Sequence, residues 1–366
     1  MRIKSDRTLS RRRRFALASL APLALLGAAS AGASTSWTLT AATPSTPSAS
    51  TPCHTGITPV TIKHVVVVME ENESESSVIG SSSAPYLNSV ASTCGLAANY
   101  HNASHPSLPN YVDLTSGSVQ GSAASKDCSY SGCPQSQNNI FAELDAKGLS
   151  WKAYAESATS DCQTSNTTLY AQRHVPAVYY TDIHSTSCKT QAVPMTSSPA
   201  GGPAVTSGNF YNDVHNGTLP ALSFVSPNLC DDGHSYISTY LYCSSNRVKN
   251  LDNWLKAWVP FILNGPNYAS GNTELFIVFD EGGGADKTNG EHCWDQARSS
   301  TSSYPSCWTT AVLVGPNTPQ LKSSTWFNHF NTLNTITGIL GVSTLTESSS
   351  TGGIPTPNSL RSTFHL

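Results

Sequence analysis

Residues 64–72 have the sequence His64-Val-Val-Val-Val-Met-Glu-Glu-Asn72, an apolar run that ends in two carboxylates and an amide. An uninterrupted apolar run of this length predicts a strand that is covered on both faces, as in parallel sheets between layers of helices. A second run, Leu275-Phe-Ile-Val-Phe279, is followed by Asp280 and Glu281 in the same way. Both predicted strands therefore deliver oxygen-bearing side chains at their carboxyl ends.

Apolar strands bounded by turn residues recur along the chain, and helical patterns separate them. The apolar runs predict strands at 64–69, 221–226, 274–280 and 310–315. The helical patterns cover 85–92, 138–147, 250–263 and 333–340. Strand alternating with helix predicts an α/β fold, a three-layer αβα sandwich around a mostly parallel sheet. Ligands bind beyond the carboxyl ends of the strands in such folds, so a site is expected there.

The first 33 residues are predicted to be a secretory leader. Seven Lys and Arg residues precede an uncharged apolar stretch at 15–29, and Ala31-Gly-Ala33 provides a cleavage site of small residues. This stretch is too short to span a membrane, so no integral membrane segment is expected after cleavage. Arg12-Arg-Arg14 fits twin-arginine export as well as the general secretory route. We therefore expect a secreted protein, either extracellular or associated with the cell wall.

The charge balance bears on the class of partner. The leader holds seven of the 20 Lys and Arg residues and one of the 23 Asp and Glu residues, which leaves 13 against 22. A nucleic-acid-binding protein would need the opposite sign, so no nucleic acid partner is expected. An acidic protein repels anionic substrates at long range. An anionic substrate would therefore need local positive charge, most simply a bound divalent cation.

The remaining chain is predicted to hold one linker and one large domain. Residues 34–60 are rich in Ser, Thr, Pro and Ala, which is typical of a flexible or wall-spanning linker. Residues 61–366 contain no second linker and form a single predicted catalytic domain.

All ten cysteines follow the leader, and an even number in an exported chain predicts disulfides. The sequence does not determine their connectivity, but the simplest neighbour pairing is 53–94, 128–133, 162–188, 230–243 and 293–307. Zinc ligation by cysteine is the alternative, and no CxxC pair supports it.

The segment Ser104-His-Pro-Ser-Leu-Pro-Asn-Tyr111 places a hydroxyl nucleophile among polar side chains. A serine hydroxyl is a weak nucleophile, so Ser107 needs a general base or a cation that stabilises its alkoxide. His105 and Asn110 are the nearby candidate catalytic residues. No G-x-S-x-G motif surrounds Ser107, which disfavours a serine esterase. The structural alternatives are a turn or helix-cap residue at Ser107 and a helix cap at Asn110.

The candidate metal ligands follow the predicted strands. Oxygen side chains at the strand ends suit a hard divalent cation, and the proposed ligands are Glu71, Asn72, Asp280 and Glu281. Gly282-Gly-Gly284 would let the backbone approach a ligand closely. An exposed acidic turn is the structural alternative for these residues.

A third strand precedes the segment Asn228-Leu-Cys-Asp-Asp-Gly-His234. Asp232 and His234 have a spacing suited to metal ligation, and His234 is also a candidate catalytic residue. An Asx turn with a solvated histidine is the alternative. His174 and His329 give weaker signals and are expected to be ordinary, partly buried histidines.

Five ordered motifs over about residues 61–345 carry a resemblance to a known family. They are residues 64–72, 105–111, 173–176, 225–234 and 279–281. The sequence resembles the secreted bacterial phosphoesterase family of acid phosphatases, phosphatidylinositol 3-phosphatases and non-specific phospholipases C, within the alkaline phosphatase superfamily. The Ser-x-Pro-Asn-Tyr segment is also similar to the Thr-x-Pro-Asn element of nucleotide pyrophosphatases, in which the hydroxyl residue attacks phosphorus. The resemblance therefore implies an alkaline-phosphatase-like fold and a nucleophilic Ser107.

The resemblance also implies roles for the other candidates. Glu71, Asn72, Asp280 and Glu281 would hold a cation that also contacts Ser107. His105, Asp232 and His234 would hold the phosphate, protonate the leaving oxygen or bind a second cation. One departure concerns residues 307–308, which are Cys-Trp where close relatives carry Asn-His. A family-like histidine is therefore missing, and His292 or His329 could replace it only if loops bring it in.

The expected activity is a secreted, metal-dependent phosphomonoesterase with a phosphoserine intermediate at Ser107. Its substrate would be a small-molecule or lipid phosphate ester, with phosphoinositides among the candidates. The alternatives are a phospholipase C or phosphodiesterase, and a non-catalytic, disulfide-stapled surface-binding protein. The sequence does not choose among calcium, magnesium, manganese, iron and zinc as the divalent cation.

Overall fold

A computed structural model describes residues 52–53, 61–196, 207–290, 293, 305–345 and 359–366. The predicted leader and nearly all of the predicted linker lie outside these described residues, and so does His292. Within the described residues, no helix is long and apolar enough to cross a membrane.

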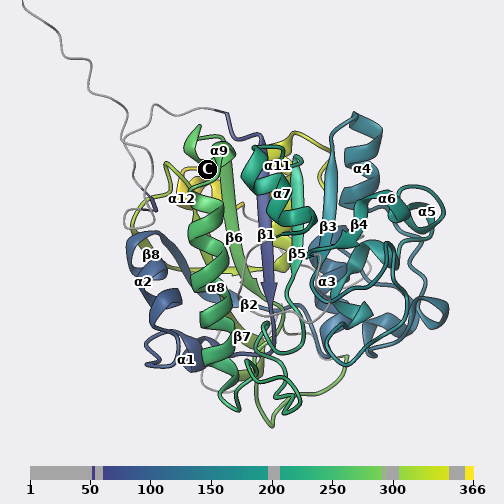
Figure 1. Cartoon of the computed structure of the whole chain (residues 1–366), viewed down its shortest axis with the longest axis horizontal. Helices are drawn as coiled ribbons and strands as arrows, with labels where there is room; N and C mark the ends of the chain where they lie inside the picture. The colour runs from purple at the N-terminus through teal and green to yellow at the C-terminus, as the bar shows by residue number, and fades with distance from the viewer. Residues whose placement is uncertain (1–51, 54–60, 197–206, 291–292, 294–304, 346–358) are drawn as a thin grey trace, which may run out of the picture. The chain divides into compact units, whose positions relative to one another are not determined.

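In the described part of the chain, eight strands form one sheet in the order β4-β3-β5-β1-β6-β7-β2-β8 (Figure 1). The strands are β1 (His64–Glu70), β2 (Gly95–His101), β3 (Trp151–Ala155), β4 (Ala192–Pro194), β5 (Leu222–Ser226), β6 (Thr273–Phe279), β7 (Trp308–Val314) and β8 (Leu321–Asn328). β7 is antiparallel to β6 and β2, and all the other pairings are parallel. The predicted mostly parallel sheet is confirmed, with one antiparallel strand inside it.

Helices cover both faces of the sheet. They are α1 (Glu75–Val78), α2 (Pro85–Thr93), α3 (Ser107–Ser116), α4 (Ile140–Lys147), α5 (Thr181–Ser185), α6 (Cys188–Gln191), α7 (Asn209–Asn216), α8 (Arg247–Leu263), α9 (Pro266–Ala269), α11 (His329–Leu340) and α12 (Leu360–Phe364). Successive side chains of a strand point to opposite faces. Val65, Val67 and Met69 of β1 accordingly pack with α3, α4, α11 and α12, whereas Val66 and Val68 pack with α2, α7, α8 and α9. This arrangement confirms the predicted three-layer αβα sandwich.

The predicted elements are found at nearly the predicted bounds. The four predicted strands are β1, β5, β6 and β7, and the four predicted helices are α2, α4, α8 and α11. Four strands had no prediction, namely β2, β3, β4 and β8. β8 lies at one edge of the sheet and leaves half of its residues exposed, so it lacks the apolar run by which the central strands were identified.

All ten cysteines are paired, and the pairs are those of the neighbour pairing. The five disulfides join Cys53 to Cys94, Cys128 to Cys133, Cys162 to Cys188, Cys230 to Cys243 and Cys293 to Cys307. No thiolate is left for zinc among these residues, so the alternative of zinc ligation by cysteine is wrong.

Candidate active site

The candidate residues meet at the carboxyl edge of the parallel strands, which is the lower edge of the sheet in Figure 1. Glu71 follows β1, and Asp280 follows β6, its neighbour in the sheet. Asp232 comes after β5, on the other side of β1. Ser107 begins α3 after the loop that leaves β2. Parallel strands bring their carboxyl ends to one edge, which explains why segments far apart in the sequence converge here.

Ser107 is the first residue of α3 and is almost fully buried. Its Oγ donates a hydrogen bond to Oε2 of Glu71 at 3.0 Å. The other oxygen, Oε1, accepts a hydrogen bond from the Tyr111 hydroxyl at 2.6 Å. Tyr111 lies one helical turn after Ser107, on the same face of α3. Ser107 therefore sits at the positive end of a helix with its hydroxyl oriented by a carboxylate.

His174 belongs to the site, which corrects the expectation of an ordinary, partly buried histidine. Its Nε2 lies 3.0 Å from Oε1 of Glu71, and its Nδ1 lies 3.3 Å from Oδ2 of Asp232. The ring is buried and stacks on Tyr111, with ring centroids 5.1 Å apart. His174 therefore lies between Glu71, which is beside Ser107, and Asp232, which follows β5. The Arg173-His-Val-Pro176 motif and the position of Tyr111 were the sequence signals for this pair.

The charges within this group shift one another's pKa. Burial opposes ionisation of Glu71, but His174, with smaller effects of His234 and Arg173, outweighs it and holds the Glu71 pKa below its ordinary value. Burial would lower the His174 pKa, but the Glu71 carboxylate prevails and raises it. Burial raises the Asp232 pKa. Glu71 and His174 therefore favour each other's charged forms next to Ser107.

Asp280 and Asn72 each leave a buried oxygen without a partner in the described part of the chain. Oδ1 of Asp280 accepts a hydrogen bond from the Asn72 backbone N at 3.0 Å. Oδ2 of Asp280 and Oδ1 of Asn72 are buried and have no hydrogen-bond partner among the described residues. Burial, followed by the charges of Glu71 and Glu281, raises the Asp280 pKa well above its ordinary value. Two bare oxygens beside a crowded set of carboxylates fit a divalent cation.

Glu281 is placed differently from the prediction. Its Oε1 accepts hydrogen bonds from Asn72 Nδ2 at 2.5 Å and from Lys287 Nζ at 2.7 Å. Its Oε2 lies 2.6 Å from Nδ1 of His105. Both oxygens of Glu281 therefore have protein partners in this arrangement. Asp232 has one engaged oxygen, because its Oδ1 accepts the His234 backbone N at 2.7 Å, whereas its Oδ2 lies 3.3 Å from Nδ1 of His174 and has no hydrogen-bond partner among the described residues.

The predicted ligands differ in how free their oxygens are. Within the described structure, Asp280, Asn72 and Asp232 each keep one buried oxygen without a hydrogen-bond partner, whereas the oxygens of Glu71 and Glu281 have protein partners. Two groups of His and Cys side chains bring three ligand atoms within 4.8 Å in the described part of the chain, His105 with Cys293 and Cys307, and Cys162 with His184 and Cys188. Each contains a disulfide, so neither offers thiolates to a metal.

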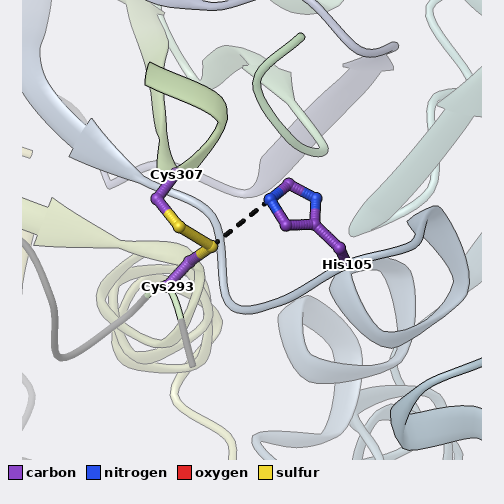
Figure 2. Close-up of side chains that lie close together, drawn as sticks. All are labelled: His105, Cys293 and Cys307. Atoms are coloured by element: carbon purple, nitrogen blue, oxygen red, sulfur yellow. Dashed lines mark hydrogen bonds between the residues drawn. A yellow bond between two sulfur atoms is a disulfide. The ribbon is translucent and has the colours of Figure 1, made fainter. Parts of the chain in front are cut away.

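His105 does not contact the nucleophile, contrary to its expected role as a neighbouring base. Figure 2 shows its ring facing the Cys293–Cys307 disulfide, with Nε2 3.5 Å from Sγ of Cys293. Cys293 also donates its backbone N to the Ala103 carbonyl at 3.0 Å. The Cys307 carbonyl lies 2.8 Å from Nδ1 of His101. The disulfide thus joins one segment that contacts Ala103 to another that contacts His101. It also contacts the His105 ring directly.

Asn110 is a positioning residue in this structure. Its Oδ1 accepts hydrogen bonds from the backbone N of Ala103 and Ser104, at 2.9 and 3.0 Å. Its Nδ2 donates to the carbonyls of Ser104 and Pro106, at 2.9 and 3.2 Å. The amide therefore shapes the loop that ends at Ser107, and the catalytic role of Asn110 stays a prediction.

His234 and Arg173 lie beside His174, and the ring centroids of His174 and His234 are 6.2 Å apart. Nε2 of the partly exposed His234 lies 3.3 Å from Nη2 of Arg173. Nε of Arg173 lies 3.3 Å from Oδ2 of Asp127, whose Oδ1 accepts the backbone N of Leu108 at 3.0 Å. Gly233 has φ 91°, a conformation that favours glycine, and this allows the turn between Asp232 and His234. A polar cavity of about 190 Å³ adjoins this group, lined by Asp127, Cys128, Ser129, Asn166, Gln172, Arg173 and Tyr179.

The histidine that the family resemblance implied near β7 has no equivalent at that position. Trp308 occupies it and donates its indole N–H to the Ala98 carbonyl at 2.9 Å. His329 begins α11, and its Nε2 lies 2.6 Å from the backbone carbonyl of Asp280. Burial lowers the His329 pKa to about 4. His329 therefore supports the Asp280 backbone and does not substitute for the missing histidine.

The geometry agrees with the family whose sequence model matches residues 81–343, the Phosphoesterase family. The chain belongs to the Phosphoesterase family. It is accordingly a hydrolase of phosphoric ester bonds, and the predicted enzyme class is confirmed. This membership also counts against a non-catalytic surface-binding protein.

This member of the Phosphoesterase family is similar in sequence to several phosphatases. A phosphatidylinositol-3-phosphatase of Mycobacterium tuberculosis is 27% identical over 283 residues, which cover 77% of this chain and 78% of the relative. An acid phosphatase of Aspergillus fumigatus is 24% identical over 208 residues, which cover 55% of this chain and 41% of the relative. A probable acid phosphatase of Kluyveromyces lactis is 25% identical over 227 residues, covering 60% and 47%. The chain thus spans less than half the length of these two fungal relatives.

A solved structure supports the fold. The structure of a protein in the alkaline phosphatase superfamily from Vibrio parahaemolyticus has a TM-score of 0.55 and 13% identity, and the match covers 81% of this chain and 72% of that one. At this identity the likeness concerns the fold alone, and it confirms the expected alkaline-phosphatase-like architecture.

Proposed function

We propose that this Phosphoesterase family member is a metal-dependent phosphomonoesterase in which Ser107 attacks phosphorus. The observation that carries the proposal is the hydrogen bond from Ser107 Oγ to Glu71 beside the two bare oxygens of Asp280 and Asn72. A divalent cation bound there would lower the pKa of the Ser107 hydroxyl and balance charge on the phosphoryl group. The relatives named as phosphatases support a monoester as the substrate.

The chain's own residues account for the other requirements of the reaction. Ser107 Oγ forms a bond to phosphorus as the bond from phosphorus to the ester oxygen breaks, and Glu71 Oε2 accepts the hydroxyl proton. Because the pKa of Glu71 is held low, this carboxylate is a weak base that mainly orients the Ser107 hydroxyl. The pKa of the Ser107 hydroxyl must therefore be lowered as well. The N-terminus of α3 and the guanidinium of Arg173 attract the anionic ester.

His234 is proposed to give a proton to the leaving alcohol, because its ring is partly exposed at the mouth of the site. Water then attacks the phosphoserine as His234 takes a proton from the water. The bond from phosphorus to Ser107 Oγ breaks, Glu71 returns its proton to Ser107, and phosphate is released. The polar cavity beside Arg173 would receive the leaving alcohol. His105 and Glu281 act indirectly, by holding Asn72 and the loop before Ser107.

The test is phosphate release from p-nitrophenyl phosphate by the wild type, with and without a chelator. Ser107→Ala should abolish release, and chelation should abolish wild-type release until a divalent metal is added back. Ser104→Ala is the matched control, because it removes a hydroxyl from the same loop whose contact to the His105 carbonyl is long, at 3.4 Å. Normal activity of Ser107→Ala would refute the proposal. Diacylglycerol release from phosphatidylcholine without monoester hydrolysis would favour the phospholipase C alternative.

We also propose that the protein is exported. Five disulfides among ten cysteines support an oxidising compartment, because cytosolic thiols are kept reduced. Fusion of residues 1–33 to a reporter enzyme should direct it out of the cell, and retention of the fusion in the cytosol would contradict the proposal.

A further inference from the structure

One loop at the edge of the active site carries most of the exposed large hydrophobic side chains of the described residues. These exposed side chains are Tyr236, Leu241 and Leu321, at 55%, 104% and 37% of their full exposure. Tyr236 and Leu241 lie in the loop closed by the Cys230–Cys243 disulfide, which also contains His234. A single exposed apolar residue is common on protein surfaces. Two of them in one short loop beside His234 indicate an interaction surface.

The loop is held in place from beneath. Ile237, Tyr240 and Tyr242 pack against a small cluster formed by Leu169 and the disulfide, separate from the two main cores. Backbone hydrogen bonds join Tyr240 N to the Ile237 carbonyl and Cys243 N to the Tyr240 carbonyl, at 3.0 and 2.9 Å. A side chain as exposed as that of Leu241 must protrude from the surface. The fold therefore presents Leu241 on a supported, convex loop.

The chemistry of this loop favours a lipid surface over a protein. Residues 235–246 contain no charged side chain, and three of them are tyrosines. Arg247 and Lys249 follow directly and are exposed, although Nη1 of Arg247 also donates to the His234 carbonyl at 3.1 Å. Tyrosine and leucine next to basic residues suit the boundary between lipid headgroups and acyl chains. A stable protein interface needs about 800 Å² from each partner, which two protruding side chains fall far short of.

We propose that residues 235–243 form a docking loop that inserts Leu241 and Tyr236 into the interfacial region of a phospholipid bilayer. Docking by this loop would hold His234 and the mouth of the site at the level of the lipid headgroups. Docking to a bilayer is a property beyond hydrolysis. It implies that the phosphate monoester is presented by a membrane, and this consequence rests on the proposed function.

Cosedimentation with sucrose-loaded vesicles of phosphatidylcholine, with and without phosphatidylglycerol, tests the docking loop without any substrate. The wild type should sediment with the vesicles. Leu241→Ser should bind about tenfold more weakly, because burial of one large apolar side chain changes an equilibrium constant by about that factor. Tyr236→Ser should also bind more weakly. Leu321→Ser is the matched control and should bind as the wild type does. Leu321 is the first residue of β8 and lies at the amino-terminal ends of the parallel strands, whereas the docking loop lies at their carboxyl ends.

Absence of wild-type binding would overturn the proposal, and so would an equal loss in Leu321→Ser. A dimer that Leu241→Ser converts to a monomer in size-exclusion chromatography, without vesicle binding, would overturn it in favour of a second copy of the chain. Hydrolysis of p-nitrophenyl phosphate by the same wild-type sample separates the two proposals. Hydrolysis without vesicle binding rejects the docking loop alone, and vesicle binding without hydrolysis rejects the proposed function alone.

Discussion

The Cys293–Cys307 disulfide is predicted to affect catalysis as well as stability. Its Cys293 sulfur lies 3.5 Å from His105 Nε2, and the two cysteines hold Ala103 and His101 through backbone atoms. The double variant Cys293→Ala/Cys307→Ala removes this support from the loop that ends at Ser107. Small displacements of a nucleophile are costly, so we expect kcat to fall about 10- to 100-fold with a much smaller change in KM.

A second disulfide provides the control. The two disulfides close loops with sequence separations of 14 and 26 residues, the longer one between Cys162 and Cys188. Loop-closure entropy predicts that their removal lowers the free energy of unfolding by about 3 and about 3.5 kcal/mol respectively. Cys162→Ala/Cys188→Ala should therefore lose slightly more stability. It should keep its kcat, because His184, the histidine beside its sulfur, is outside the site.

The assay is urea unfolding of both double variants, combined with steady-state kinetics on p-nitrophenyl phosphate at a temperature where both are folded. The expected result is a similar loss of stability and a loss of kcat in the Cys293 and Cys307 variant alone. An equal fall of kcat in both variants would mean that destabilisation, and not positioning of the loop, explains the loss. Unchanged kcat in both would refute the positioning role of the disulfide.

Three further predictions concern buried groups. Tyr111→Phe removes a hydrogen bond to the charged Glu71, so urea unfolding should show a loss of about 2 kcal/mol, and a loss below 0.5 kcal/mol would contradict the assigned contact. Burial raises the pKa of Glu274 from 4.5 to about 8, so the folded protein binds more protons than the unfolded chain between these values and stability falls as pH rises. Between pH 5 and 8 the wild type should lose about 3 kcal/mol more than Glu274→Gln, and parallel pH profiles in urea unfolding would reject this. Gly233→Ala should lower both stability and kcat, because its Cβ would lie 2.6 Å from Leu251 Cδ2. Gly80→Ala is the control with a similar φ and no close neighbour, and equal effects in both assays would count against the crowding.

The central strands and the nucleophile segment could be predicted because their signals are local. The run of valines before Glu70 and the apolar run before Asp280 are long enough to identify buried strands without knowledge of their neighbours. Ser107 was identified as a candidate nucleophile from a short motif, whereas the helix α3 that it begins had no prediction. The disulfide pairing followed from proximity in the sequence, since each bond closes a modest loop. The edge strand β8, in which four of eight residues are exposed, gave no comparable signal.

The partners of the site residues could not be predicted in the same way. Glu281 and Asp280 are adjacent in the sequence and were predicted to act alike, yet the structure pairs Glu281 with His105 and leaves an oxygen of Asp280 bare. His174 comes from a loop 67 residues after Ser107 and reaches Glu71 only because that loop folds back over the carboxyl edge of the sheet.

The sequence by itself determined the fold class and predicted a candidate nucleophile and a site at the strand ends, because strand burial and short motifs depend on neighbours along the chain. Only the tertiary structure decided which carboxylate oxygens of the described residues stay without a partner, which histidine lies beside Glu71 and which hydrophobic side chains protrude beside His234. These features depend on strand order and loop closure, which bring together residues whose separation in sequence leaves no local pattern.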